Sequence, residues 1–190
     1  MNGSEAEGEA GGSVNPLRDG LTVVVGVGAA IAVLVLHRSN PLTAVGTAGV
    51  VLVSTWLAVI DFREHRLPNR IVGPLAGAVA AWIVVAGLVE DDLGRTIRAL
   101  GFGLVVAGFL LVASIVGGLG MGDVKYGFPM AAAVGWFGWD ALSVAIVVTT
   151  VSGAAVAVAM LVIGRGRGAH LSYGPYMALG LACGLLAAAP

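Results

Sequence analysis

Charge is scarce in this 190-residue chain: Lys, Arg, Asp and Glu make up 11% of it, and the formal net charge is −1. So few charged side chains, gathered in short segments, could not give a soluble core a polar surface. The near-zero net charge provides no basic field for nucleic acid, which we exclude as a partner. Cysteine is nearly absent as well. The single residue, Cys183, excludes an internal disulfide and a multi-thiolate zinc site.

Apolar sequence dominates instead. Hydrophobic residues make up 58% of the chain, and its mean hydropathy is +0.96. Both values are far above those of soluble domains and indicate a protein that lies in the lipid bilayer. Because a spanning helix needs about 20 mainly apolar residues, the breaks between runs predict an all-α, polytopic transmembrane helix bundle of about seven spans. These are residues 21–36, 42–60, 71–89, 96–117, 124–138, 140–163 and 174–189.

Two segments differ from the regular pattern of long apolar runs. Residues 1–20 are rich in Gly, Ser and Glu, which predicts a disordered polar tail before a single transmembrane domain at 21–190. The fifth apolar run is short and contains Pro129, so it is either a full span or a tilted or re-entrant helix. At its end, Trp136 and Trp139 suit the lipid headgroup belt.

The placement of Lys and Arg predicts the orientation, since positive loops stay in the cytoplasm. With the N-terminus inside, seven basic residues fall on the inner side and three on the outer side. The inner ones are Arg18, Arg63, Arg66, Arg70, Lys125, Arg165 and Arg167, and the outer ones are Arg38, Arg95 and Arg98. We therefore expect a multi-pass protein of the cytoplasmic (inner) membrane with its N-terminus in the cytoplasm.

Two acidic residues stand at the boundaries of apolar runs rather than in the tail or the acidic loop. Asp61 follows the run 41–60, and Asp123 lies in the glycine-rich segment 117–125. In the expected topology both reach the inner membrane face. An ionisable residue at this boundary suggests a function, because burying a charge is costly unless it is paired or used.

Peptide hydrolysis without a covalent intermediate needs two such carboxyl groups. One carboxylate takes a proton from water while the other, protonated, polarises the scissile carbonyl, and the pair shares one proton. Asp123 precedes an expected helix start, where the helix dipole favours an anion, whereas Asp61 lies near a helix C-terminus. We therefore expect Asp61 to hold the shared proton more of the time. Gly120 and Gly122 lack Cβ atoms, which allows close approach of a substrate and positive φ angles.

Simpler interpretations stand beside these. Asp123 could be only an N-cap after a glycine-rich turn, and Asp61 a solvated residue at a helix end. Lys125 could be a positive-inside anchor or a contact for an acidic side chain of a substrate. His65 and His170 fit loop residues, and neither has the partners that a metal site requires.

Three segments, taken together, resemble the type IV prepilin peptidases, which are aspartyl membrane proteases of the GxGD type. They match the family's GxGD signature, its first-aspartate motif and the Gly-Pro segment that opens its last helix. The segments are Gly120-Met-Gly122-Asp123-Val-Lys125, then Asp61 with Arg63, Leu67, Pro68 and Asn69, and Tyr173-Gly174-Pro175-Tyr176. The resemblance covers about residues 42–189, and implies a six-helix protease core preceded by one N-terminal helix.

The resemblance implies an aspartic endopeptidase that cuts the leader peptide of type IV prepilin-like precursors at the cytoplasmic membrane face. Asp61 and Asp123 would be catalytic, with the other matched residues binding substrate or shaping the site: Gly120, Gly122, Lys125, Pro68, Asn69, Gly174 and Pro175. No metal or organic cofactor is expected. The chain lacks the paired cysteines that accompany N-methylation in the larger relatives, so methyltransferase activity is not expected. It looks closer to the compact peptidases of Flp (tight-adherence) pili or pseudopili.

Other functions remain open at this stage. Archaeal preflagellin peptidases share the catalytic pattern, whereas presenilin-like enzymes are disfavoured because Ile60, not tyrosine, precedes Asp61. From a different class, a small ion- or proton-coupled transporter could use acids at the membrane edge. A purely structural partner of a secretion complex would need neither acid. The sequence indicates no oligomeric state.

Overall fold

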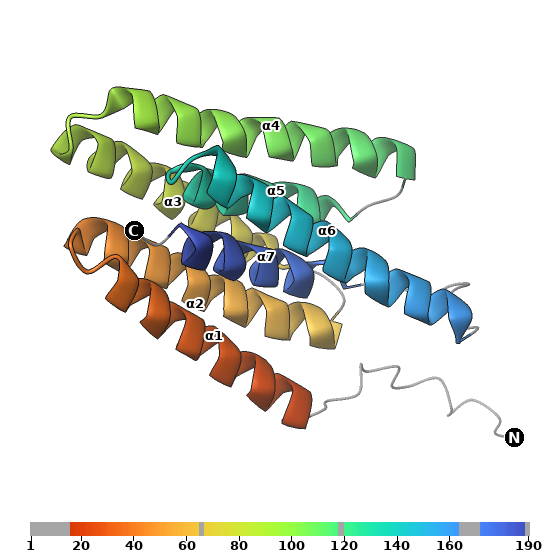
Figure 1. Ribbon diagram of the computed structural model, residues 1–190. Helices are drawn as coiled ribbons and strands as arrows, with labels where there is room; N and C mark the ends of the chain where they lie inside the picture. The colour runs from red at the N-terminus through yellow and green to blue at the C-terminus, as the bar shows by residue number, and fades with distance from the viewer. Residues whose placement is uncertain (1–15, 65–66, 118–119, 164–171, 189–190) are drawn as a thin grey trace, which may run out of the picture.

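The computed structural model describes residues 16–64, 67–117, 120–163 and 172–188. In these residues the chain is all-helical, with seven helices (Figure 1). The helices are α1 (Pro16–Leu36), α2 (Pro41–Glu64), α3 (Asn69–Val89), α4 (Leu93–Gly117), α5 (Met121–Gly135), α6 (Trp139–Val162) and α7 (Gly174–Ala187).

Each helix coincides with one of the apolar runs, which confirms the expected all-α membrane bundle. Among the described residues, five helices are long and apolar enough to cross a membrane: α1, α2, α3, α4 and α6. The other two are short, with 15 residues in α5 and 14 in α7. The first helix begins at Pro16 rather than at residue 21, so the end of the expected tail is helical. Residues 1–15 lie outside the described part of the chain.

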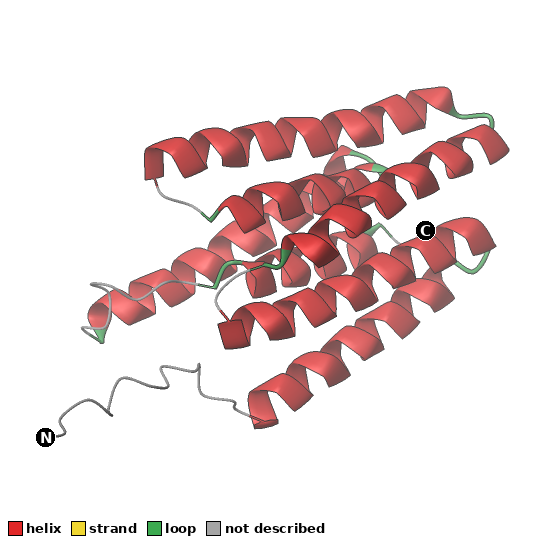
Figure 2. Ribbon diagram, turned by 180° about the vertical axis from the view of Figure 1, so that it is seen from behind, coloured by secondary structure: helices red, strands yellow, loops and turns green. Residues whose placement is uncertain are grey.

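The helices lie roughly side by side, with α1 and α4 at opposite edges of the bundle (Figures 1 and 2). Successive helices run in opposite directions, so the chain turns alternately at two ends. At one end α2 finishes and α3, α5 and α7 begin, and we call it the Asp61 end. At the other end α3 finishes and α4 begins, and we call it the Glu90 end.

Helix α5 forms the centre of the bundle, in contact with α2, α3, α4, α6 and α7. Its residues from Pro129 to Gly135 are buried, and so is Trp136 directly after it, which is 1% exposed. The prediction that Trp136 lies in the headgroup belt is therefore wrong: its ring packs against Trp82, with centroids 6.0 Å apart. Trp139, at 64% exposed, does fit a lipid-facing position.

A polar cluster closes the Glu90 end. The Glu90 carboxylate accepts hydrogen bonds from the Asn40 amide and the Thr43 hydroxyl, and Arg95 Nη1 lies 2.7 Å from it. The Arg95 guanidinium also stacks over the Trp136 ring, 5.1 Å from its centroid. These contacts tie α2, α3 and α4 together at the end of the bundle opposite Asp61.

Candidate active site

Asp61 is a buried acid at one end of the bundle. It lies in the last turn of α2 and is 4% exposed, so the simpler interpretation of a solvated residue is wrong. Its Oδ2 accepts a hydrogen bond of 3.0 Å from the backbone N–H of Gly174, the first residue of α7. Its backbone carbonyl accepts another of 2.6 Å from the Ser172 hydroxyl. Residues far away in sequence therefore hold Asp61 in place.

The close approach of α7 to Asp61 depends on glycine at position 174. A Cβ atom added there would lie 2.8 Å from Asp61 Oδ2 and 3.3 Å from Asp61 Cβ. Pro175 follows in the first turn of α7, where a missing N–H costs nothing because no helical partner exists for it. The Gly-Pro pair thus begins the helix and leaves room for the carboxylate.

Asp123 lies in the first turn of α5, at the same end of the bundle as Asp61. The N-cap of α5 is Gly120, so the interpretation of Asp123 as an N-cap is wrong. Helix α5 is not one of the five membrane-length helices. Burial of the carboxyl group, followed by the negative charge of Asp61, raises the pKa of Asp123 to about 7. The two acids are thus close enough to interact electrostatically, and they would share a proton near neutral pH.

The geometry reverses the expected division of the proton between the two acids. The expectation considered only the dipole of each residue's own helix, which disfavours an anion at the end of α2. The Asp61 carboxylate, however, receives the N-terminal N–H of α7, and a helix N-terminus stabilises negative charge. Together with the raised pKa of Asp123, this favours an ionised Asp61 and a protonated Asp123.

Gly122, directly before Asp123, has a packing role that the sequence did not reveal. A Cβ atom on Gly122 would lie 2.9 Å from the Cβ of Leu67 and 3.4 Å from its backbone oxygen. Gly122 therefore lets α5 begin directly against the segment that joins α2 to α3. The prediction of positive φ angles is wrong, since Gly120 has φ −60° and, of the described glycines, Gly138 has positive φ.

The remaining matched residues link the starts of α3 and α5. Pro68 is the N-cap of α3, and Asn69 is the first residue of that helix. The Lys125 ammonium donates a hydrogen bond of 3.0 Å to the Asn69 side-chain oxygen at an exposed position. Lys125 therefore has a protein partner in addition to its expected role as a positive-inside anchor.

An ion pair that was not predicted from the sequence lies beside the site. Asp19, assigned to the disordered tail, is 4% exposed in the first turn of α1. Its Oδ2 lies 2.8 Å from Arg63 Nε, two residues after Asp61. The guanidinium of Arg18 lies over the ring of Phe62, 4.6 Å from its centroid. An acidic residue directly before an apolar run was the available signal.

Tyr173 was matched to the family motif but given no role. Burial of its phenol and the charge of Asp123 raise the pKa of Tyr173, and a hydrogen bond with Thr150 opposes this effect. A Cβ atom on Gly153 would come within 2.9 Å of the Tyr173 ring. The lack of a side chain at Gly153 therefore lets the ring pack closely against α6. Tyr173 therefore connects α6 with the neighbourhood of Asp123.

Within the described ranges, no group of three or more His, Cys, Asp or Glu side chains could hold a metal ion. His65 and His170 lie outside those ranges, as do Arg66, Arg165 and Arg167. The candidate site therefore consists of Asp61, Asp123, the N-termini of α5 and α7, and the glycines that allow these helix ends to pack closely.

Comparison with known proteins identifies the family of this chain. The model of the type IV leader peptidase family matches residues 48–160, a range that includes both acids. The chain is 31% identical over 127 residues to the prepilin leader peptidase/N-methyltransferase of Escherichia coli (strain K12), covering 65% of this chain and 55% of that protein. It is 32% identical over 138 residues to the protein of the same name from Burkholderia pseudomallei (strain 1026b), covering 70% and 43%.

A third relative of that name, from Pseudomonas aeruginosa, is 30% identical over 141 residues, covering 70% of this chain and 47% of the relative. The chain thus spans about half the length of the curated relatives that it matches. No solved structure shows a significant match.

Proposed function

Because this chain belongs to the type IV leader peptidase family, we propose that it is a membrane-embedded aspartic endopeptidase that removes leader peptides from type IV prepilin-like precursors. Asp61 and Asp123 are its catalytic acids. The observation that carries the proposal is that Asp61, in the last turn of α2, and Asp123, in the first turn of α5, lie at one end of the bundle, although 62 residues and two helices separate them in sequence. A structural subunit would need neither acid, and a transporter would leave the match to the leader peptidase family unexplained.

The reaction follows from the unequal surroundings of the two acids. The ionised Asp61, held by the Gly174 N–H, takes a proton from a water molecule, whose oxygen attacks the scissile carbonyl carbon. The protonated Asp123 donates a hydrogen bond to the carbonyl oxygen and stabilises the negative charge that develops there. When the C–N bond breaks, the leaving amine takes up a proton from the pair, and the acids return to one shared proton.

The membrane face is inferred from the distribution of charge. Among the described residues, the Asp61 end carries Arg18, Arg63, Arg70 and Lys125, and the Glu90 end carries Arg38, Arg95 and Arg98. Positive residues favour the cytoplasm, so the Asp61 end and the N-terminus of α1 face it, in the inner membrane. Reporter fusions at both chain ends test this orientation.

The substrates we favour are precursors of Flp (tight-adherence) pilins or pseudopilins. Of the two activities in the relatives' name, we propose only the leader peptidase activity for this chain. That the chain has no methyltransferase activity stays a prediction, based on its single cysteine. Co-expression with candidate precursors, read by the mass of the product, identifies the substrate and the bond that is cut.

The decisive experiment replaces each acid by its isosteric amide. We expect Asp61→Asn and Asp123→Asn each to abolish processing of a co-expressed prepilin, while the protein still inserts into the membrane. The matched control is Asp140→Asn, which changes an exposed acid in the first turn of α6 at the Glu90 end. It should cleave normally. Processing at the wild-type rate by either dyad variant would contradict the assignment.

A further inference from the structure

An apolar groove runs along one side of the bundle between α4 and α6. The backbones of these two helices do not approach each other in the described residues, and α5 and α7 form the floor between them. The cavity there has a volume of about 410 Å³. Its walls include Phe102, Val106 and Phe109 of α4, with Ile146 and Thr150 of α6.

The two ends of the α4/α6 groove differ. At the Glu90 end the rings of Phe102 and Trp139 lie 5.8 Å apart and close it. At the Asp61 end the lining residue is Tyr173, which precedes the residue that holds Asp61 and lies within the electrostatic influence of Asp123. The Asp61 end of the groove therefore lies beside Gly174, the residue that binds Asp61, although neither acid lines the groove itself.

The length of this groove suits one short helical segment. From Trp139 to Thr150 the wall follows about three turns of α6, which rise roughly 16 Å. On α4, Phe102, Val106 and Phe109 lie on one face at helical spacing. Phe109 is 72% exposed and Ile146 is 38% exposed, so this apolar surface has room for a partner.

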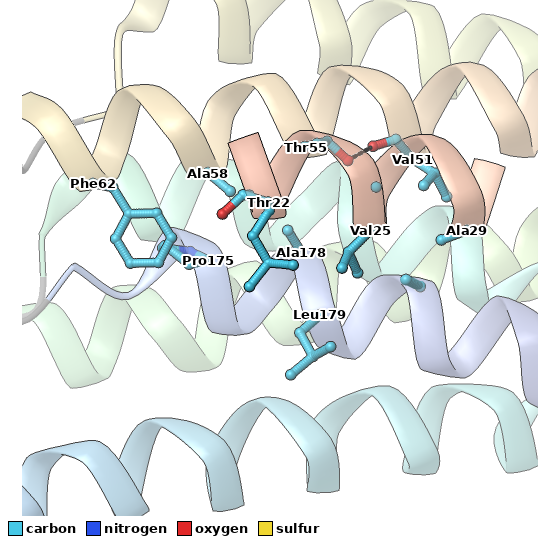
Figure 3. A pocket seen from close by; sticks show the side chains of 13 residues that line it. Thr22, Val25, Ala29, Val51, Thr55, Ala58, Phe62, Pro175, Ala178 and Leu179 are labelled. Carbon is cyan, nitrogen blue, oxygen red and sulfur yellow. Dashed lines mark hydrogen bonds between the residues drawn. The ribbon is translucent and has the colours of Figure 1, made fainter. Parts of the chain in front are cut away.

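A second groove, between α1, α2 and α7, is the alternative (Figure 3). It has a volume of about 240 Å³ and ends near Phe62 and Pro175, which neighbour Asp61 and Gly174 in sequence. In Figure 3, Val25 and Ala29 of α1 project into the space above α7. Helix α1 contacts both α2 and α7, which narrows this groove.

We propose that the α4/α6 groove binds the apolar helical segment that directly follows the leader peptide of the precursor, with the scissile bond beside Tyr173. This inference rests on the proposed function. Its occupant is a single apolar helix because the groove is apolar, its walls are exposed at Phe109 and Ile146, and Tyr173, next to Gly174, lines its Asp61 end. The groove then sets how far from the apolar segment the chain is cut.

Photocrosslinking tests this placement. The photoreactive residue p-benzoylphenylalanine is introduced at Ile146, inside the groove. The crosslinking therefore does not depend on Cys183. The probe is a precursor with a leader peptide followed by an apolar segment of about 20 residues. Two matched positions are Val147, adjacent to Ile146 and 57% exposed, and Leu179, which lines the second groove and is 42% exposed.

We expect an adduct with the apolar segment of the precursor from Ile146, and none from Val147 or Leu179. An adduct from Leu179 alone assigns the precursor to the second groove and overturns the inference. So does an Ile146 adduct, identified by mass, that contains only lipid or a second copy of this chain. If the wild-type protein leaves the precursor uncut, the proposed function fails and the groove assignment falls with it. If it cuts the precursor but Ile146 gives no precursor adduct, only the groove assignment is overturned.

Filling the groove provides a kinetic test. Ile146→Trp should raise the KM for the precursor by about tenfold or more, because the indole occupies the space of the bound helix. The neighbouring Val147→Trp adds the same bulk outside the groove, and it should leave KM within about twofold of the wild type. Equal KM values for the two variants would overturn the inference.

Discussion

The backbone N–H of Gly174 donates a hydrogen bond of 3.0 Å to Asp61 Oδ2, across 113 residues of sequence. This contact places the N-terminus of α7 on a carboxylate that ends α2. It explains how an acid at a helix C-terminus can carry a stabilised negative charge. It also makes position 174 intolerant of any side chain.

Gly174→Ala should therefore impair catalysis. The added Cβ would lie 2.8 Å from Asp61 Oδ2, so either the carboxylate or the start of α7 must move. Under the proposed function, a shift of this kind at Asp61 costs roughly 100-fold in rate. The measurement is the rate of precursor processing at equal amounts of inserted protein.

Gly77→Ala is the matched control for this change. It lies in α3, nothing lies within 4 Å of its added Cβ, and alanine is the better helix former. We expect its processing rate to stay within about twofold of the wild type. Wild-type activity in Gly174→Ala would show that α7 does not position Asp61.

The rate of processing should fall on the alkaline side of about pH 7. The pKa of Asp123 is raised from 3.8 to about 7, first by burial and then by the charge of Asp61. Above that value Asp123 loses its proton, both acids are negative, and the rate should drop about tenfold per pH unit. Processing by the protein in detergent, measured between about pH 6 and about pH 9, checks the alkaline limb. A flat profile would exclude Asp123 as the proton donor.

The same raised pKa affects stability, with a definite sign. Between pH 3.8 and about 7 the folded protein holds a proton on Asp123 that the unfolded chain has released. The free energy of unfolding therefore falls as the pH rises through this window and levels off above it. Asp123→Asn removes this contribution, so comparing the thermal unfolding of the two proteins across the window isolates it.

The ion pair between Asp19 and Arg63 should stabilise the packing of α1 on α2. Asp19→Ala removes the buried acceptor, and we expect it to lower the free energy of unfolding by about 2 kcal/mol. Unfolding in detergent, measured for both single variants and the double variant with Arg63→Ala, gives the coupling energy. Asp140→Ala, at an exposed acid, should change stability by less than about 0.5 kcal/mol. Additive effects at Asp19 and Arg63 would mean that the pair contributes nothing.

The sequence predicted the number and order of the helices because each lies in an apolar run bounded by Gly, Pro or charge. It also placed Asp61 and Asp123 at one end of the bundle, since two helices separate them. It could not reveal that α7 begins on Asp61, because that contact depends on how distant helices pack. Trp136 was misplaced for a related reason: the part of α5 from Gly127 to Gly135 is apolar on every side, so no periodicity indicates which face is buried.

Helices α5 and α7 are shorter than the five helices that could cross a membrane. Helices of 15 and 14 residues rise only about 22 Å, less than the roughly 30 Å of a hydrocarbon core. Trp136, after α5, and Ala188, after α7, line one cavity at the Glu90 end, so the missing length falls at the other end. There the longer α6 projects past α7 (Figure 1). Under the proposed function, the acids lie in a recess below the headgroups that water enters from the loops, and bilayer thickness governs its access.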